Sequence, residues 1–74
     1  MSNTQDNENI TVVINTELVI NTVTKERKVA NVCYVDGEIF DRKIYNTIIE
    51  AENDKLNYSE EITKIIYNEF NASK

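Results

Sequence analysis

The residue with the most reactive side chain in this sequence is Cys33, the only cysteine of a 74-residue chain that contains no histidine. Histidine is the commonest general base in enzymes, so a Cys33 nucleophile would depend on a nearby Lys, Asp or Glu. Cys33 lies between Val32 and Tyr34, an apolar setting that favours an inert, buried side chain. A single cysteine excludes an internal disulfide and, without histidine, a structural zinc site within one chain. We therefore expect no catalytic residue, no metal and no cofactor.

Two groups of acidic residues are the next candidates for chemistry. Asp36, Glu38 and Asp41 lie close together and could bind a hard cation such as calcium. They lack the ligand spacing of a helix–loop–helix calcium site, so we interpret them as a solvated turn. A second group could imitate the phosphate spacing of a nucleic acid, but Lys55 and Lys64 interrupt it, and a solubilising helical surface is the interpretation that we favour. This possible acidic docking surface comprises Glu50, Glu52, Asp54, Glu60 and Glu61.

A basic cluster, Lys25, Arg27 and Lys28, falls between two predicted strands and is a possible phosphate-binding hairpin tip. The net charge of −5 argues against broad electrostatic binding to nucleic acid. A charged tip that protects the end of a sheet from association is the simpler interpretation.

Three predicted strands must position these side chains. Residues 10–23 alternate in polarity with a period of two, and the even-numbered positions are nearly all apolar, which predicts a long strand with one buried face. Residues 29–35 and 38–42 supply the second and third strands of an antiparallel meander. A loop at 25–27 would pair Leu18 with Tyr34 and Ile20 with Val32. Asp36-Gly37, which contains the only glycine, predicts a type I′ turn between the second and third strands.

Two helices are predicted after the strands. The first has apolar residues at 44, 45, 48 and 49, with Asp41 or Asn46 as its N-cap, and it ends near Asn53-Asp54. Ser59 would cap the second, whose apolar stripe is formed by Ile62, Ile65, Ile66 and Phe70, flanked by Tyr58 or Tyr67.

Together these elements predict one α+β domain over residues 10–71, with βββαα topology and both helices packed on one face of the sheet. Residues 1–9 are polar and predict a disordered tail, and residues 72–74 a frayed end. No segment has the length and hydropathy of a membrane span or a secretory signal, so we expect a cytoplasmic protein.

The odd-numbered face of the long strand is the predicted interface. If the helices cover the even-numbered face, the apolar residues of the other face remain without cover, unless one helix wraps around to bury them. That face, or the open edge of the first strand, could pair with a second copy or with a target. The predicted interface residues are Val13, Val19, Val23, Val29, Cys33 and Val35.

These observations predict a small, acidic, non-enzymatic interaction protein, acting as a homodimer on a protein target. The abundance of Asn, Ile, Lys and Tyr is typical of AT-rich coding, which fits a phage or mobile-element inhibitor of a host factor. The alternatives are a dimeric regulator that contacts nucleic acid through the basic hairpin tip, and a phage structural or assembly subunit.

Overall fold

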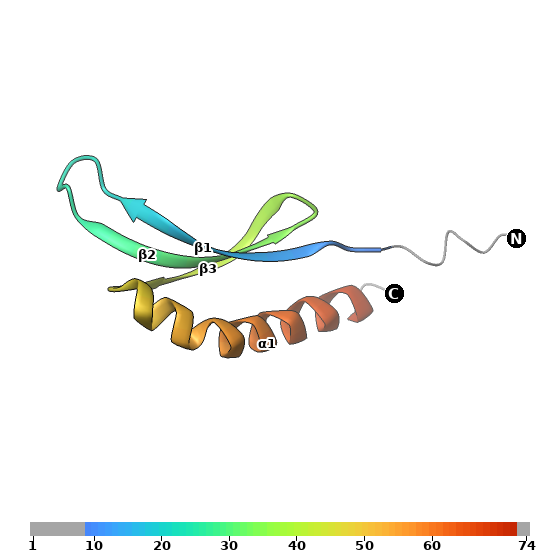
Figure 1. Cartoon of the computed structure of the whole chain (residues 1–74). Helices are drawn as coiled ribbons and strands as arrows, with labels where there is room; N and C mark the ends of the chain where they lie inside the picture. The colour runs from blue at the N-terminus through green and yellow to red at the C-terminus, as the bar shows by residue number, and fades with distance from the viewer. Residues whose placement is uncertain (1–8, 73–74) are drawn as a thin grey trace, which may run out of the picture.

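The computed structural model describes residues 9–72 as a three-stranded antiparallel sheet with one long helix beneath it (Figure 1). The strands are β1 (Val12–Ile20), β2 (Arg27–Val35) and β3 (Glu38–Tyr45), in the order β1-β2-β3, and they are followed by α1 (Ile48–Ala72). The α+β class and the meander agree with the sequence. The prediction of two helices is wrong. The predicted tail lies outside the described residues except for Asn9, as do residues 73 and 74 of the predicted frayed end.

The first hairpin has a shorter first strand and a longer loop, residues 21–26, than predicted, and its strands pair in a different register. β1 ends at Ile20 because Asn21 turns the chain: its side-chain Oδ1 accepts hydrogen bonds from the backbone N–H groups of Val23 (2.9 Å) and Thr24 (3.1 Å). Lys25 then adopts a φ of 67°. Leu18 consequently pairs with Val29 rather than Tyr34, and Ile20 with Arg27 rather than Val32.

This register shift changes which residues of β2 share a face with the even-numbered residues of β1. Ile14 lies opposite Cys33 and Thr16 opposite Asn31. The side chains of directly opposed residues project from the same face of the sheet. The even-numbered residues of β1 therefore share the helix-facing side with the odd-numbered residues of β2.

The predicted turn at Asp36-Gly37 is confirmed, with φ values of 52° and 87°. Positive φ at both central residues is what a type I′ turn requires. The Asp36 carboxylate also accepts a hydrogen bond from the backbone N–H of Thr11 at 3.0 Å, which ties the turn to the start of β1.

β3 extends three residues beyond its predicted end. Ile44 and Tyr45, predicted in the first helix, pair in the sheet with Ala30 and Val29. The register of β2 with β3 shifts between Cys33 and Tyr34, which is a β-bulge that increases local twist.

The single helix begins at a capping box that the sequence prediction missed. The backbone N–H of Glu50 donates to Thr47 Oγ1 (3.2 Å), and the backbone N–H of Thr47 donates to Glu50 Oε1 (3.3 Å). Neither Asp41 nor Asn46 is the N-cap. Ser59, predicted to cap a second helix, lies inside α1, where its carbonyl accepts a hydrogen bond from Thr63 Oγ1.

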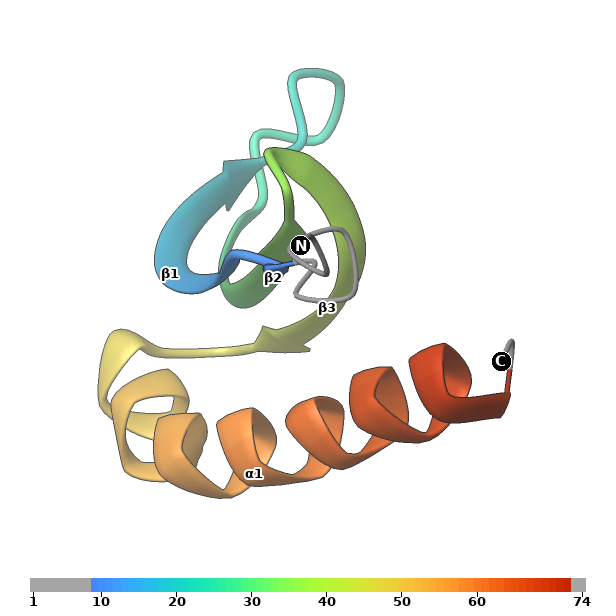
Figure 2. The same cartoon turned by 90° about the vertical axis from the view of Figure 1, so that its right-hand side faces the viewer.

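The core lies between α1 and one face of the sheet. Cys33, Tyr58, Ile62 and Ile66 form its buried centre, with Ile14, Val35 and Phe40 packed around them. Of the predicted helical stripe, Ile62 and Ile66 are buried, whereas Ile65 and Phe70 are exposed. The sheet curls away from the helix (Figure 2), so its second face is concave. Ala30 and Val32 are buried on that face.

Candidate protein-binding surfaces

A buried polar bridge fixes the start of the helix against the sheet. Asn31 is fully buried at the centre of β2. Its side-chain Nδ2 donates to the carbonyl of Ala51 in α1 at 2.8 Å, and its Oδ1 accepts from Thr16 Oγ1 at 2.8 Å. Because an unpaired buried amide is costly, these bonds favour one position of the helix along the sheet.

A second polar connection joins the end of β3 to the next turn of the helix. Asp54 Oδ2 accepts hydrogen bonds from the Tyr45 hydroxyl (2.6 Å) and the Lys43 ammonium (2.9 Å). These bonds lower the pKa of the Asp54 carboxyl below its ordinary value of 3.8. The same contact with Asp54 raises the pKa of Lys43. Asp54, which the sequence analysis assigned to a possible acidic docking surface, is therefore already paired within the molecule.

The one thiol lies beside a tyrosine–aspartate pair. The Tyr58 hydroxyl donates to Asp41 Oδ2 at 2.9 Å, and burial followed by this bond raises the pKa of Tyr58. Burial, then the charge of Asp41, raises the pKa of the Cys33 thiol. A buried thiol with a raised pKa is a poor nucleophile. The hydrogen bond between Tyr58 and Asp41 joins α1 to β3. Among residues 9–72, no group of His, Cys, Asp and Glu side chains is placed to hold a metal ion.

The structure does not bring the six predicted interface residues together. Val29, Cys33 and Val35 belong to the helix-facing side of β2, where Cys33 and Val35 contribute to the core. Val13 and Val19 lie on the opposite, concave face, and Val23 is in the β1–β2 loop. The concave face buries Ala30 and Val32 by itself, and it is bridged by a hydrogen bond from the Tyr34 hydroxyl to Glu17, which raises the pKa of Tyr34.

The predicted acidic docking surface is only partly assembled. Glu50 caps the helix, and Asp54 binds Tyr45 and Lys43. Neither residue therefore contributes a free carboxylate to the predicted acidic docking surface. Glu52, Glu60 and Glu61 are exposed on α1. The helix nevertheless concentrates negative charge, since residues 48–72 contain six acids and two bases, whereas residues 9–47 contain five of each.

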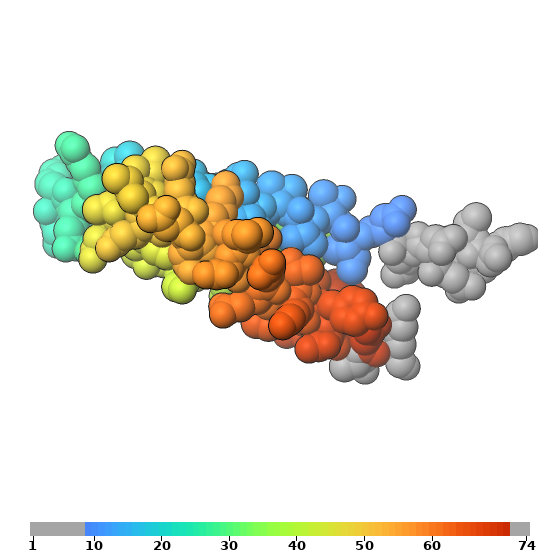
Figure 3. All heavy atoms as spheres, turned by 60° about the horizontal axis from the view of Figure 1, so that its bottom comes forward, coloured from blue at the N-terminus to red at the C-terminus, as the bar shows by residue number. Residues whose placement is uncertain are grey.

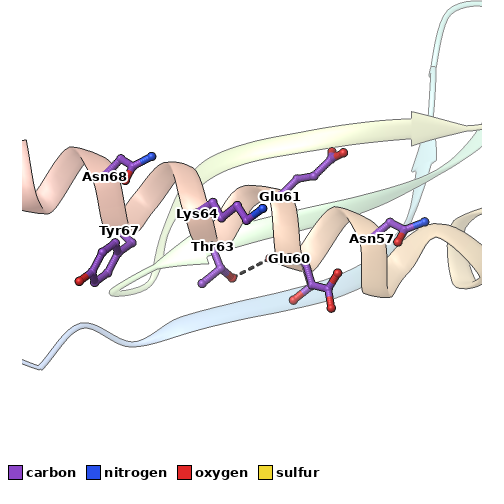
Figure 4. Close-up of a pocket in the computed structure, with 8 residues that line it drawn as sticks. Asn57, Glu60, Glu61, Thr63, Lys64, Tyr67 and Asn68 are labelled. Atoms are coloured by element: carbon purple, nitrogen blue, oxygen red, sulfur yellow. Dashed lines mark hydrogen bonds between the residues drawn. The ribbon is translucent and has the colours of Figure 1, made fainter.

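The outer face of the helix combines these acids with exposed apolar side chains. Ile49, Leu56 and Tyr67 are 67%, 70% and 67% exposed, and their separations of seven and eleven residues correspond to whole turns of a helix. Figure 4 shows the second half of this face, where a shallow hollow of about 660 Å³ is formed by side chains of α1 alone. We define the outer helix face as Ile49, Glu52, Leu56, Glu60 and Tyr67.

A second exposed feature is the outer edge of β1. In Figure 3 the blue spheres of β1 lie along one side of the molecule, beside the helix. Leu18 and Ile20 project from the helix-facing side of the sheet, yet they are 63% and 52% exposed because the helix does not cover the end of this strand. No other described strand pairs with this edge.

The basic hairpin tip is divided by the fold. Lys25 and Arg27 are exposed, whereas Lys28 donates to Asn46 Oδ1 at 2.6 Å, near the junction with the helix. Glu26 lies between Lys25 and Arg27 at the end of the β1–β2 loop. The tip therefore presents a mixed rather than a strongly basic surface.

These elements define a small α+β domain with a βββα order, and exposed apolar side chains lie on its outer helix face and at its β1 edge. No family model, no curated protein and no solved structure matches the chain. Within residues 9–72, no helix has the length and hydropathy needed to cross a membrane.

The sequence analysis offered the open edge of the first strand as one possible interface, but it missed the outer helix face. The expected helix break near Asn53-Asp54 separated Ile49 from Leu56 and Tyr67 and left Leu56 between two helices, so the alignment of the three residues on one face did not emerge. The capping box Thr47-x-x-Glu50 is a signal in the sequence that would have placed the start of the helix correctly.

Proposed function

We propose that this protein acts without catalysis, by binding another protein through the outer helix face. The observation that carries the proposal is the exposure of Ile49, Leu56 and Tyr67 along one side of a 25-residue helix. Exposed large apolar side chains aligned on one face of a helix, with polar groups between them, can serve as anchors for a partner protein. Helix-in-groove recognition uses anchors with this kind of spacing.

The charge of the helix defines the partner further. Glu52 and Glu60 flank the apolar anchors of the outer helix face, and α1 as a whole is acidic. The complementary partner is a protein with an apolar groove edged by Lys or Arg. Occupation of such a groove would exclude its usual ligand, which is the form that inhibition of a host factor by this protein would take.

The proposal is supported by the balance of apolar side chains. Among the described residues, seven apolar side chains are buried and fourteen large apolar residues are exposed. A chain of this length buries only about 60% of its unfolded surface alone, so binding to a partner would add cover that the fold lacks.

Affinity capture with matched variants tests this function. The wild-type chain, Leu56→Asp and the concave-face control Val13→Ser are immobilised and exposed to a lysate of the source cells. We expect a specific protein that is retained by the wild type and by Val13→Ser, is lost with Leu56→Asp, and elutes with salt. The purified partner is then titrated against Tyr67→Ala, for which we expect a weakening of about tenfold or more, since aromatic anchors commonly carry 2 kcal/mol or above. Equal retention by all three chains would contradict the proposal.

A further inference from the structure

We propose that two copies of this protein pair edge to edge through β1, antiparallel, with Thr16 of one copy opposite Thr16 of the second copy. This inference is independent of the proposed function, because it uses the opposite layer of the molecule from the outer helix face. It rests on the direction of the backbone groups of β1, on the order of its side chains, and on the contrast between β1 and the other edge strand.

The backbone of β1 presents a free row of donors and acceptors. The backbone N–H of Asp36 donates to the carbonyl of Thr11 (2.8 Å), and the N–H of Asn21 donates to the carbonyl of Glu26 (2.9 Å). Hydrogen-bonded pairs alternate along an antiparallel ladder, so the odd-numbered residues of β1 bond to β2. The even-numbered residues, from Val12 to Ile20, therefore direct their N–H and C=O groups away from the sheet.

The side chains of β1 are self-complementary about Thr16. The strand reads VVINTELVI, which is three apolar, three polar and three apolar residues. Antiparallel pairing centred on Thr16 opposes apolar residues at every position outside the polar centre. The pairs are Val12 with Ile20, Val13 with Val19, Ile14 with Leu18, Asn15 with Glu17, and Thr16 with itself.

Neighbouring registers are less favourable. A shift that centres the pairing on Asn15 opposes Ile14 with Thr16 and Val13 with Glu17. A shift that centres it on Glu17 opposes two carboxylates directly, which is destabilising. The register centred on Thr16 also pairs all nine residues of β1, and its even-numbered pairs are those whose backbone groups face outward.

This pairing covers side chains that the single chain leaves exposed. Directly opposed residues lie on the same face of a sheet, so Leu18 of one copy would contact Ile14 of the second copy on the helix-facing side. A two-fold axis through Thr16 places both helices on that same side of a continuous six-stranded sheet. The strand order would be β3-β2-β1 followed by β1-β2-β3 of the second copy.

The other edge strand is protected against such pairing. β3 carries Glu38, Asp41, Arg42 and Lys43 and contains the register shift opposite Cys33. Charged residues and bulges are the devices by which edge strands avoid association. β1 has no Lys, Arg or Pro, and its one charged residue, Glu17, accepts a hydrogen bond from Tyr34 within the same chain.

Light scattering on the full chain tests the assembly, with one variant in each exposed surface. The wild type should show twice the 8.6 kDa chain mass. Leu18→Lys should raise the dissociation constant at least about tenfold, the effect of about 1.4 kcal/mol, while the matched control Leu56→Lys leaves it unchanged. A wild type that stays monomeric up to about 1 mM, where binding is worth only about 4 kcal/mol, overturns the proposal. Dissociation by Leu56→Lys but not by Leu18→Lys would do the same, because the interface would then be the helix.

Disulfide trapping tests the register and does not depend on Leu18→Lys folding. In a Cys33→Ala background, Val13→Cys combined with Val19→Cys should form a covalent dimer on mild oxidation. Position 13 would lie opposite position 19 of the second copy in a non-hydrogen-bonded pair, with Cα atoms about 4.5 Å apart, a separation that a disulfide can span. Asn15→Cys alone should remain uncrosslinked. Crosslinking of Asn15→Cys without crosslinking of the double variant would overturn the register.

Discussion

At the scale of single residues, the structure depends on polar side chains that the core cannot leave unpaired. Asn31 is the only buried polar residue among those described, and it contacts both β1 and α1 through one amide group. The alternation of apolar and polar residues along the strand gave no reason to single out Asn31. Its role depends on the positions of Thr16 and Ala51 in the folded chain. The bridge leads to a simple prediction about stability.

Asn31→Ala should lower the free energy of unfolding by about 2 kcal/mol, because it removes two hydrogen bonds and leaves the Thr16 hydroxyl without its buried acceptor. Urea unfolding followed by circular dichroism measures this loss. The control is Asn15→Ala, an exposed position on the other face of the sheet, which should change stability by less than about 0.5 kcal/mol. Equal losses in the two variants would contradict the role of the bridge.

Asp54 provides a prediction about pH. Its pKa is lowered in the folded state by the hydrogen bonds from Tyr45 and Lys43, so the ionised carboxylate stabilises the fold. This contribution is complete above the ordinary pKa of 3.8 and is lost as the pH falls through the lowered value. Asp54→Asn should therefore be less stable than the wild type near neutral pH, and the difference should shrink in acid.

The urea midpoints of the wild type and Asp54→Asn, measured from neutral pH down to acid, test this prediction. Glu60→Gln, which removes an exposed carboxylate from the outer helix face, is the control. Parallel curves for the wild type and Asp54→Asn, separated by a constant amount down to the most acidic pH, would show that the ionised form of Asp54 does not stabilise the fold.

At the scale of elements, the turn between β2 and β3 was predicted correctly, whereas the loop of the first hairpin and the start of the helix were not. The Asp36-Gly37 turn could be predicted because its conformation depends on two adjacent residues. The register of β1 and β2 could not, because it depends on the Asn21 side chain closing the loop. Both faces of β1 contain apolar residues, so the pattern accepted either alignment.

The helix shows the same limit. Asn53 and Asp54 have low helix propensity, by up to about 0.7 kcal/mol each, and they suggested a break. Asp54 instead binds Tyr45 and Lys43, and the buried residues Tyr58, Ile62 and Ile66 hold the following turns on the sheet. Tertiary contacts therefore outweigh the local preference. The error also hid the outer helix face, whose residues align only in a continuous helix.

Glu60→Pro distinguishes one helix from two. If a helix began after Ser59, position 60 would be its first residue, where proline is favourable. In the interior of α1, proline removes a backbone hydrogen bond and clashes with the preceding turn, at a cost of about 3 kcal/mol or more. We expect that loss in urea unfolding, together with reduced helical circular dichroism. Glu60→Ala serves as the control, and unchanged stability in Glu60→Pro would contradict the continuous helix.

At the scale of the whole molecule, the small core makes stability and association inseparable. Fourteen large apolar residues are exposed among those described, and they lie on both layers of the fold. The sequence predicted that the domain would need a partner, and it offered the open edge of the first strand as one place for it. Exposed apolar side chains lie at that edge, on the outer helix face, and on the concave face, where Val13, Ile39 and Ile44 are exposed.

If β1 pairs with a second copy, unfolding must depend on protein concentration. Each tenfold increase in chain concentration should stabilise the dimer by about 1.4 kcal/mol relative to two unfolded chains, so the urea midpoint should rise with concentration. Leu18→Lys should remove this dependence. A wild-type midpoint that stays constant over a hundredfold range of concentration would argue for a folded monomer.

The burial of Cys33 has a consequence for the order of events during folding. β1, β2 and β3 pair in sequence order, whereas the residues that cover Cys33 from below, Tyr58, Ile62 and Ile66, come from the last third of the chain. The thiol therefore becomes inaccessible only when the helix docks. Pulse labelling of this single cysteine with a thiol reagent during refolding would time that docking step directly, without an engineered labelling site.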